Sequence, residues 1–378
     1  MRKVMTLVGT RPELIKMSRV IAELDRQTKH VLVHSGQNHD FELNEVFFNE
    51  LGIRKPDHFL GVAAESAAKT IAAVIAKADD VFTLERPDAL LLYGDTNTGL
   101  AVLAAKRQKI PVFHMEAGNR CFDQRVPEEL NRKVLDHLSD INLVLTEHSR
   151  RYLIAEGIRA ETIIKTGSHM GEVLSYYMPK IQASDVLRRG GLEAGKFFLV
   201  SAHREENVDT EGNLRDLLET LRALVAEYHY PILVSTHPRT RKRLDELGES
   251  IDDPLIQFAK PFGLFDYVKL QMSAFCVLSD SGTITEEASI LSLPAVTIRY
   301  AHERPEGMDE GTLIMCGLKR ETVLDAVRVV TNQHDRERRV IPLVQDYLTK
   351  PVSKQIVRVV LSYTDYVNQT VWHKAGTP

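Results

Sequence analysis

Short apolar runs alternate with longer amphipathic stretches along almost the whole chain. In the first half the apolar runs are KVMTLV (3–8), HVLVHS (30–35), DALLLYG (88–94), IPVFHM (110–115) and INLVLT (141–146). Between them lie stretches such as PELIKMSRVIAELDRQ (12–27), whose apolar residues recur at helical spacing. Continuous apolar strands that alternate with helices predict a parallel sheet with helices on both faces.

The same alternation restarts in the second half of the chain. Its apolar runs are FFLVSA (197–202), PILVST (231–236), LIQFAK (255–260), FCVLSD (275–280) and AVTIRY (295–300). We therefore predict an α/β fold of two doubly wound, Rossmann-like domains that face a central cleft. The first domain would span residues 1–168 and the second 169–355, and a last helix at about 356–378 would pack back on the first domain.

Composition narrows the class of protein. The chain has 378 residues, 43% of them hydrophobic, and a net charge of −4, so neither nucleic acid nor an anionic membrane is expected as its main partner. No apolar run approaches the ~18 residues of a membrane span, and the N-terminus reaches Arg11 too soon for a signal-peptide core. The three cysteines are far apart, which favours the cytoplasm and argues against a disulfide framework.

The unusual residues of this chain follow its predicted strands. In open parallel sheets, ligands bind beyond the carboxyl ends of the strands. The loops at those ends read GTRPE (9–13), SGQN (35–38), GDTNT (94–98), MEAGNR (115–120), SAHREEN (201–207), STHPRT (235–240) and DSGTITEE (280–287). We expect these seven loops to line the cleft.

The stretch HMEAGNRCFDQRVPEELNR (114–132) concentrates charge beside a buried strand. His114 and Glu116 should share one side of that strand, because side chains alternate. The H-x-E pattern is also found in zinc deaminases, but no P-C-x-x-C follows it, so a metal is rejected. Glu128, Glu129 and Arg132 open a helix, where acids also suit the helix dipole.

Two further loops offer candidate groups. Asp95 follows a buried strand, where an aspartate often only starts a helix. GTRPELIKM lacks both G-x-G-x-x-G and the P-loop lysine spacing, but Arg11 and Lys16 at a helix start favour phosphate. A plain strand-to-helix turn with surface charges explains that motif equally well.

The second half offers an anion site. Ser281, Gly282 and Thr283 open a helix and present backbone N–H groups, as a diphosphate requires. The alternative is a capping box of Thr283 with Glu286, and both interpretations can hold together. Cations also recur at the strand ends of this half, namely His203, Arg204, His237 and Arg239.

Taken together, these motifs resemble those of the non-hydrolysing UDP-N-acetylglucosamine 2-epimerase superfamily. The similarity runs from GTRPE through GDTNT, MEAGNR, PEELNR, HREEN and HPRT to DSGTITEE and ERPEG, about residues 9 to 311. It implies a GT-B-type fold with UDP on the second domain, and usually a homodimer. It further implies inversion at C2 of the sugar by elimination and re-addition of UDP, with neither metal nor cofactor.

The resemblance also implies roles for particular residues. It places Asp95, Glu116 and Glu128 as the essential carboxylates and His203 near the transferring proton or the diphosphate. Charged groups around the diphosphate and sugar would be Arg11, Lys16, Arg132 and His237. The nucleotide site would comprise Ser281, Gly282, Thr283 and Glu287, with Glu287 on the ribose.

Some motifs resemble one branch of the superfamily more than the others. Typical UDP-N-acetylglucosamine members read D-S-G-G-I-Q-E-E and V-E-A-G-L-R, where this chain has DSGTITEE and MEAGNR. CFDQRVPEE, SGQNHDFELNEVFF and STHPRT are similar to the branch that makes UDP-N-acetyl-L-fucosamine from UDP-2-acetamido-2,6-dideoxy-L-talose for capsule or O-antigen synthesis. The family's allosteric site often uses a Gln–His pair, but here Gln37 precedes Asn38, which argues against activation by substrate.

Three other functions compete with this one. The first is the same reaction on UDP-N-acetylglucosamine. The second is a GT-B glycosyltransferase, which needs an acceptor groove and has less use for three acids around one sugar. The third is a nucleotide-sugar sensor, which would have no need of Asp95, Glu116 and Glu128.

Overall fold

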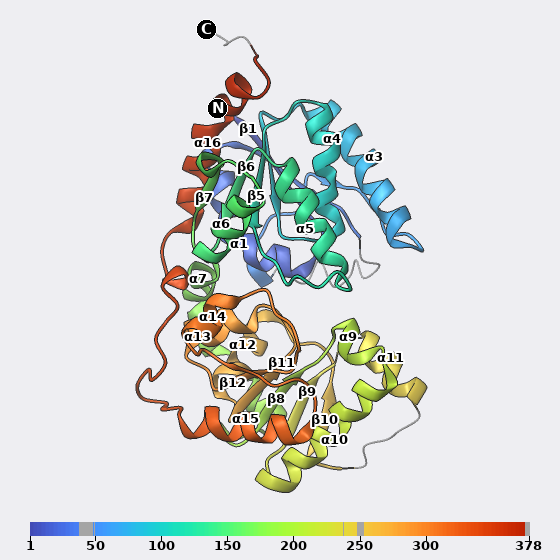
Figure 1. Ribbon diagram of the computed structural model, residues 1–378, viewed down its shortest axis with the longest axis vertical. Coiled ribbons are helices and arrows are strands. Elements are labelled where there is room, and N and C mark those ends of the chain that lie inside the picture. Colours follow the sequence, from blue (N-terminus) through green and yellow to red (C-terminus); the bar gives the residue numbers. More distant parts are fainter. Residues whose placement is uncertain (38–47, 49, 237, 248–252, 375–378) are drawn as a thin grey trace. The chain divides into compact units, whose positions relative to one another are not determined.

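The computed structural model describes residues 1–37, 48, 50–236, 238–247 and 253–374 (Figure 1). The chain divides into two compact units, one formed by Met1–Val173 with Thr349–Pro378 and the other by Leu174–Leu348. Each unit contains one parallel sheet flanked by helices, so the predicted α/β class is confirmed.

The first unit holds a seven-stranded sheet of order β3-β2-β1-β4-β5-β6-β7. Its elements are β1 (Lys3–Val8), α1 (Arg11–Gln27), β2 (Lys29–His34), β3 (His58–Phe59), α3 (Ala67–Glu85), β4 (Ala89–Tyr93), η1 (Asn97–Ala101), α4 (Val102–Arg107), β5 (Val112–Ala117), α5 (Pro127–Leu138), β6 (Ile141–Val144), α6 (Glu147–Ala155), η2 (Ala160–Thr162), β7 (Ile163–Lys165) and α16 (Val352–Thr370). The helix α7 (Met170–Ala183) crosses the boundary between the units. The strand order reverses between β1 and β4, which is where this class of sheet binds ligands.

The second unit holds a six-stranded sheet of order β10-β9-β8-β11-β12-β13. Its elements are α8 (Val186–Gly190), β8 (Phe198–Ser201), α9 (Glu205–Val208), α10 (Glu211–Tyr228), β9 (Ile232–Ser235), α11 (Pro238–Leu247), β10 (Ile256–Ala259), α12 (Leu264–Ser273), β11 (Cys276–Ser279), α13 (Ile284–Leu291), β12 (Ala295–Thr297), α14 (Pro305–Asp309), β13 (Ile314–Met315), α15 (Arg320–Asn332) and η3 (Gln345–Tyr347). Here the order reverses between β8 and β11.

The local sequence explains why α1 starts where it does. Thr10 is the N-cap residue and Pro12 occupies the first turn, where its missing N–H costs nothing. The Glu13 carboxylate accepts hydrogen bonds from the backbone N–H groups of Gly9 and Thr10, which closes a capping box. The turn between β1 and α1 is therefore fixed by the helix's own third residue.

Apolar side chains from both faces of each sheet form the cores. In the first unit, residues of β1, β2, β4 and β5 pack with α3 and α4, and Leu92, Val102 and Leu135 are fully or almost fully buried. The helix α16 packs along α1 (Figure 1). Its residues Ile356 and Val360 are completely buried. No helix among the described residues is long and apolar enough to cross a membrane.

Candidate active site

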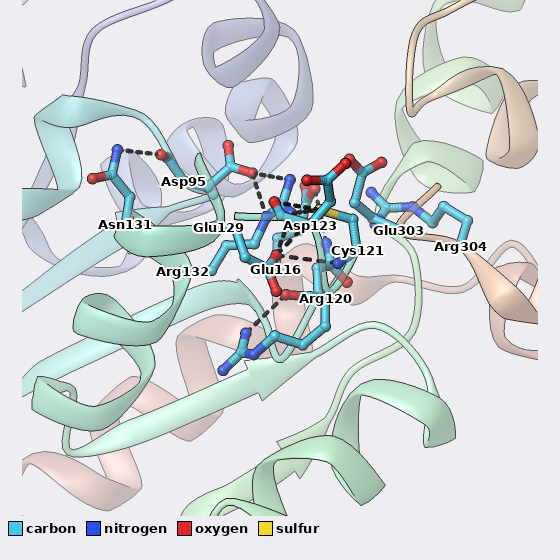
Figure 2. Close-up of polar contacts among 12 residues, drawn as sticks. Asp95, Glu116, Arg120, Cys121, Asp123, Glu129, Asn131, Arg132, Glu303 and Arg304 are labelled. Carbon is cyan, nitrogen blue, oxygen red and sulfur yellow. Dashed lines mark hydrogen bonds and ion pairs between the residues drawn. The ribbon is translucent and has the colours of Figure 1, made fainter. Parts of the chain in front are cut away.

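Glu116, at the end of β5, is the centre of a buried polar cluster in the first unit (Figure 2). Its Oε2 lies 2.8 Å from Nζ of Lys16 on α1 and accepts a hydrogen bond from the Tyr93 hydroxyl at the end of β4. Its Oε1 lies 3.2 Å from Nδ2 of Asn119. Lys16 is only 7% exposed, so this ion pair is shielded from water.

The backbone at Glu116 is strained. Its φ of +64° lies in the left-handed region, which a residue other than glycine seldom occupies. The pairing of β5 with β6 shifts register between Met115 and Ala117, so Glu116 forms a bulge. Strain of this kind persists where the surroundings hold a side chain in a required place, and it is common in active sites.

The bulge corrects one prediction made from side-chain alternation. His114 and Glu116 do not share one side of the strand, because the irregular residue breaks the two-residue period. His114 Nδ1 lies 2.9 Å from Oδ1 of Asp136 on α5, and its Nε2 lies 2.7 Å from the Gly94 carbonyl oxygen. Glu116 instead contacts α1 and β4.

Asp136 also holds the loop that follows Glu116. It accepts hydrogen bonds from the Gly118 N–H and from Nη1 of Arg120, the latter at 2.7 Å. The guanidinium of Arg120 is completely buried and pairs with Glu156 as well. A side chain at Gly118, whose φ is +79°, would place its Cβ 2.5 Å from the Ser149 carbonyl oxygen. Much of the charge in residues 114–132 therefore stabilises the loop.

Asp95, in the turn after β4, forms a second cluster with α5 (Figure 2). Its Oδ2 lies 2.8 Å from Nε of Arg132, and its backbone carbonyl accepts a hydrogen bond from Asn131. The Asp95 side chain is 29% exposed, whereas the Arg132 side chain is 5% exposed. This carboxylate is therefore oriented by a buried arginine and still reaches solvent.

Glu128 and Glu129 have different surroundings although they are adjacent. Glu129 is 1% exposed, pairs with Arg132 at 2.9 Å and accepts the backbone N–H groups of Cys121 and Phe122. Glu128 is half-buried, and within the described ranges its carboxylate has no hydrogen bond or ion pair. Glu129 thus orders the loop, and Glu128 is left available for a ligand.

Glu13 is a buried acid to which the sequence analysis assigned no role. Burial raises its pKa to about 7, although hydrogen bonds from Thr96, Gly9 and Thr10 act in the opposite direction and Asp95 adds to the rise. It lies 2.6 Å from the Thr96 hydroxyl, beside Asp95 in the chain. The T-x-x-E spacing of a capping box was the available signal. Arg11 begins the same helix and is half-buried.

In the second unit, Asp280 fixes the loop after β8. This fully buried carboxylate accepts the backbone N–H groups of His203 and Arg204 at 2.8 and 2.9 Å and the side chain of Asn207 at 3.1 Å. Nδ1 of His203 lies 3.1 Å from Asp280, and the histidine side chain is 38% exposed. Asp280 thus sets the orientation of His203, a role that sequence analysis did not assign.

The loop after β11 leads into α13 and carries Ser281, Gly282 and Thr283. The Ser281 and Thr283 hydroxyl oxygens lie 3.0 Å apart. In the described part of the chain, the Gly282 N–H and the Arg204 guanidinium have no hydrogen-bond partner, and a Cβ on Gly282 would lie 3.9 Å from Nη2 of Arg204. These donors lie at the N-terminus of a helix, an arrangement that suits an anion.

The capping box of Thr283 with Glu286 is not formed. Glu286 is completely buried and pairs with Arg304 at 3.0 Å, while Thr283 makes no side-chain cap. Glu287 is half-buried and accepts a hydrogen bond from Nε2 of Gln271 at 2.6 Å. Of the two acids, only Glu287 is therefore accessible to a ligand.

The ERPEG motif (303–307) packs against the start of α13, because its Arg304 pairs with Glu286 of that helix. Arg299 pairs with Glu303 at 2.9 Å. The Tyr347 hydroxyl donates to Glu306, and burial raises the pKa of this glutamate.

His237 and Asn38, both singled out from sequence, lie outside the described residues. No group of three or more His, Cys, Asp or Glu side chains that could hold a metal ion occurs in the described ranges.

The chain is similar to several known proteins over most of its length. The structure of a protein named UDP-N-acetylglucosamine 2-epimerase from Rickettsia bellii is 60% identical, covers 99% of this chain and 100% of its own, and superimposes with a TM-score of 0.92. A protein of the same name from Methanococcus maripaludis is 34% identical over 88% of this chain and 93% of its own. A third relative, UDP-2,3-diacetamido-2,3-dideoxy-D-glucuronate 2-epimerase from Pseudomonas aeruginosa, is 32% identical over 86% of this chain and 91% of its own.

The model of one protein family, described as UDP-N-acetylglucosamine 2-epimerase, matches residues 22–361. That range includes Glu116, Asp95 and the start of α13, while Lys16 lies before it. On this match and on these relatives, the chain belongs to the UDP-N-acetylglucosamine 2-epimerase family.

Proposed function

We propose that this protein is an isomerase that inverts C2 of a UDP-linked 2-acetamido sugar. The observation that carries this proposal is the strained Glu116, held by Lys16 and Tyr93 at the carboxyl ends of the central strands. A carboxylate fixed in this way suits proton transfer to and from carbon. Family membership supports the same reaction.

The reaction proceeds by elimination and re-addition. A carboxylate takes the proton from C2, the new C1–C2 double bond forms, and UDP leaves C1 with the electrons of the C–O bond. A proton then adds to the opposite face of C2 and UDP returns to C1. Glu116, Asp95 and Glu128 are the acids that serve these proton transfers.

The second unit supplies the groups for UDP. The diphosphate binds at the start of α13, where it meets the Gly282 N–H, the Ser281 and Thr283 hydroxyls and the Arg204 guanidinium. Glu287 accepts the ribose hydroxyls, and His203, oriented by Asp280, acts near the diphosphate or the transferring proton. Arg11, Lys16, Arg132 and His237 complete the charged surroundings of the diphosphate and sugar.

For the sugar, two candidates have separate support. UDP-2-acetamido-2,6-dideoxy-L-talose, giving UDP-N-acetyl-L-fucosamine, is favoured by DSGTITEE and CFDQRVPEE, because Thr283 narrows a site where many members have glycine. UDP-N-acetylglucosamine, giving UDP-N-acetylmannosamine, is favoured by the names of the relatives. We choose the first because Thr283 is part of the anion site itself.

The test is to incubate the protein with each UDP-sugar in deuterated water. We expect deuterium at C2 of the L-talose derivative, without any acceptor, and at least tenfold slower exchange with UDP-N-acetylglucosamine. Faster exchange with UDP-N-acetylglucosamine would reverse the choice of substrate. A glycosyltransferase or a sensor incorporates no deuterium from either sugar, and that result would end the proposal.

Three sequence-based expectations remain predictions: a homodimer, a cytoplasmic location, and a role in capsule or O-antigen synthesis. Light scattering of the purified chain checks the first. Cell fractionation checks the second, and loss of the polysaccharide from a deletion strain checks the third.

A further inference from the structure

Tyr93 lies between Glu116 and a second buried side chain, His169. The Tyr93 hydroxyl donates to Oε2 of Glu116 and also lies 3.1 Å from Nε2 of His169. The two rings meet edge to face, with centroids 5.2 Å apart. Tyr93 is 4% exposed and His169 only 1%, so both polar groups are removed from solvent.

The hydrogens of these groups can be placed by counting donors and acceptors. A tyrosine hydroxyl carries one hydrogen, and a carboxylate only accepts. Tyr93 therefore donates its hydrogen to Glu116, and the contact with His169 is satisfied when Nε2–H donates to the Tyr93 oxygen. The result is a chain of donors that runs from His169 through Tyr93 to Glu116.

Glu116 receives further donors from two other segments packed against it. Lys16 of α1 lies 2.8 Å away, and Asn119, in the loop after β5, lies 3.2 Å away. The Lys16 ammonium and the Tyr93 hydroxyl meet on the same oxygen, Oε2. Donors to a buried carboxylate stabilise its charged form and fix its orientation.

We propose that Tyr93 and His169 are positioning residues that hold Glu116 as an oriented carboxylate, ready to take the C2 proton. This inference rests on the function proposed above. A proton arriving on Glu116 weakens the bond from Tyr93, so the donor chain also favours the return of Glu116 to its charged form. In the opposing interpretation, Tyr93 and His169 only fill space beside β4.

Tyr93→Phe distinguishes the two, because it removes one oxygen and keeps the ring. We expect kcat to fall about tenfold, KM to change less than about threefold, and the acid limb of the kcat/KM–pH profile to move up by about one pH unit. Tyr363→Phe, on the half-buried face of α16, is the matched control and should leave the profile unchanged.

His169 gives a second, independent variant. His169→Gln retains an amide donor and should keep most of the activity, whereas His169→Leu should behave like Tyr93→Phe. A ¹⁵N spectrum of the histidines in the unliganded protein should show His169 protonated on Nε2, and this signal should change in Tyr93→Phe. That readout requires no turnover.

The outcomes separate this inference from the proposed function. Deuterium exchange by the wild-type protein with an unshifted pH profile in folded Tyr93→Phe would refute the donor chain and keep the epimerase. An absence of exchange in the wild type would refute the epimerase, while an Nε2–H signal that responds to Tyr93→Phe would still support the chain. A His169 protonated on Nδ1 alone would overturn the donor chain directly.

Discussion

The two sheets differ in how the charged side chains are paired at the point where the strand order reverses. Beside β1 and β4, Glu116 pairs with Lys16 and Asp95 pairs with Arg132, so each acid meets a base of its own unit. Beside β8 and β11, the acid Asp280 is buried to hold backbone N–H groups, while the Arg204 guanidinium and Gly282 N–H find no partner among the described residues. The same sheet topology thus carries two different kinds of site.

This difference indicates a division of labour. A carboxylate that is held beside its cation stays charged and oriented, so it is ready to accept a proton. Hydrogen-bond donors without a partner at a helix start can each form a new bond when an anion binds, which stabilises the bound anion. The comparison can be tested by changing one region at a time.

The largest effect is expected from Glu116→Gln in the first unit. The amide cannot accept the C2 proton, so kcat should fall by about 10³-fold or more. The affinity for UDP, measured by calorimetry, should stay within about threefold, since most of the groups that we propose for UDP binding lie in the second unit. A comparable loss of UDP binding would contradict the division of labour.

Arg204→Met should have the complementary effect. Losing a charge-assisted contact to the diphosphate should weaken UDP binding by about 10- to 100-fold. Ser281→Ala should weaken it in the same direction, and so should Arg11→Ala, although Arg11 lies in the first unit. Arg188→Met, at an exposed position of the same unit, is the control. Unchanged UDP affinity in all three site variants would place the diphosphate elsewhere.

Glu13 predicts a pH dependence that belongs to the first unit alone. Its folded pKa of about 7 exceeds the ordinary 4.5, so the folded state binds the proton more tightly than the unfolded state does. Its contribution to stability is therefore highest below pH 4.5 and is lost as the pH rises to about 7, by about 3 kcal/mol. Urea unfolding at pH 5 and pH 8 should show a smaller difference for Glu13→Gln than for the wild type. An equal difference would assign the pH dependence to other groups.

The smallest effect is expected from Thr283→Gly. It removes the hydroxyl contact with Ser281 and widens the helix start. We expect the ratio of kcat/KM for the two UDP-sugars to move about threefold to tenfold toward UDP-N-acetylglucosamine, with little change in UDP affinity. A ratio unaffected by this substitution would remove Thr283 from the choice of sugar.

The sequence predicted ten of the strands because buried parallel strands are continuous apolar runs. It missed β3, β7 and β13, which have two or three residues each and are too short to show a period. All three are edge strands, where pairing with a neighbour defines the strand.

Candidate site residues could be found by their place after strands, but their partners could not. The contact of Lys16 with Glu116 joins residues 100 positions apart, and that of Asp280 with His203 joins residues 77 apart. The bulge at Glu116 depends on how β5 pairs with β6, and alternation alone wrongly placed His114 and Glu116 on one side of the strand. The different roles of Glu128 and Glu129 depend on the loop that folds over α5.

The return of α16 to α1 has a consequence for synthesis on the ribosome. The residues that complete the first unit, 349–378, are translated only after the whole of the second unit. At ribosomal speed the apolar face of α1 waits about half a minute for its cover, whereas residues 174–348 can fold as soon as they emerge. A nascent chain that stalls short of Val352 would therefore carry a finished carboxy-terminal half and an unfinished amino-terminal one.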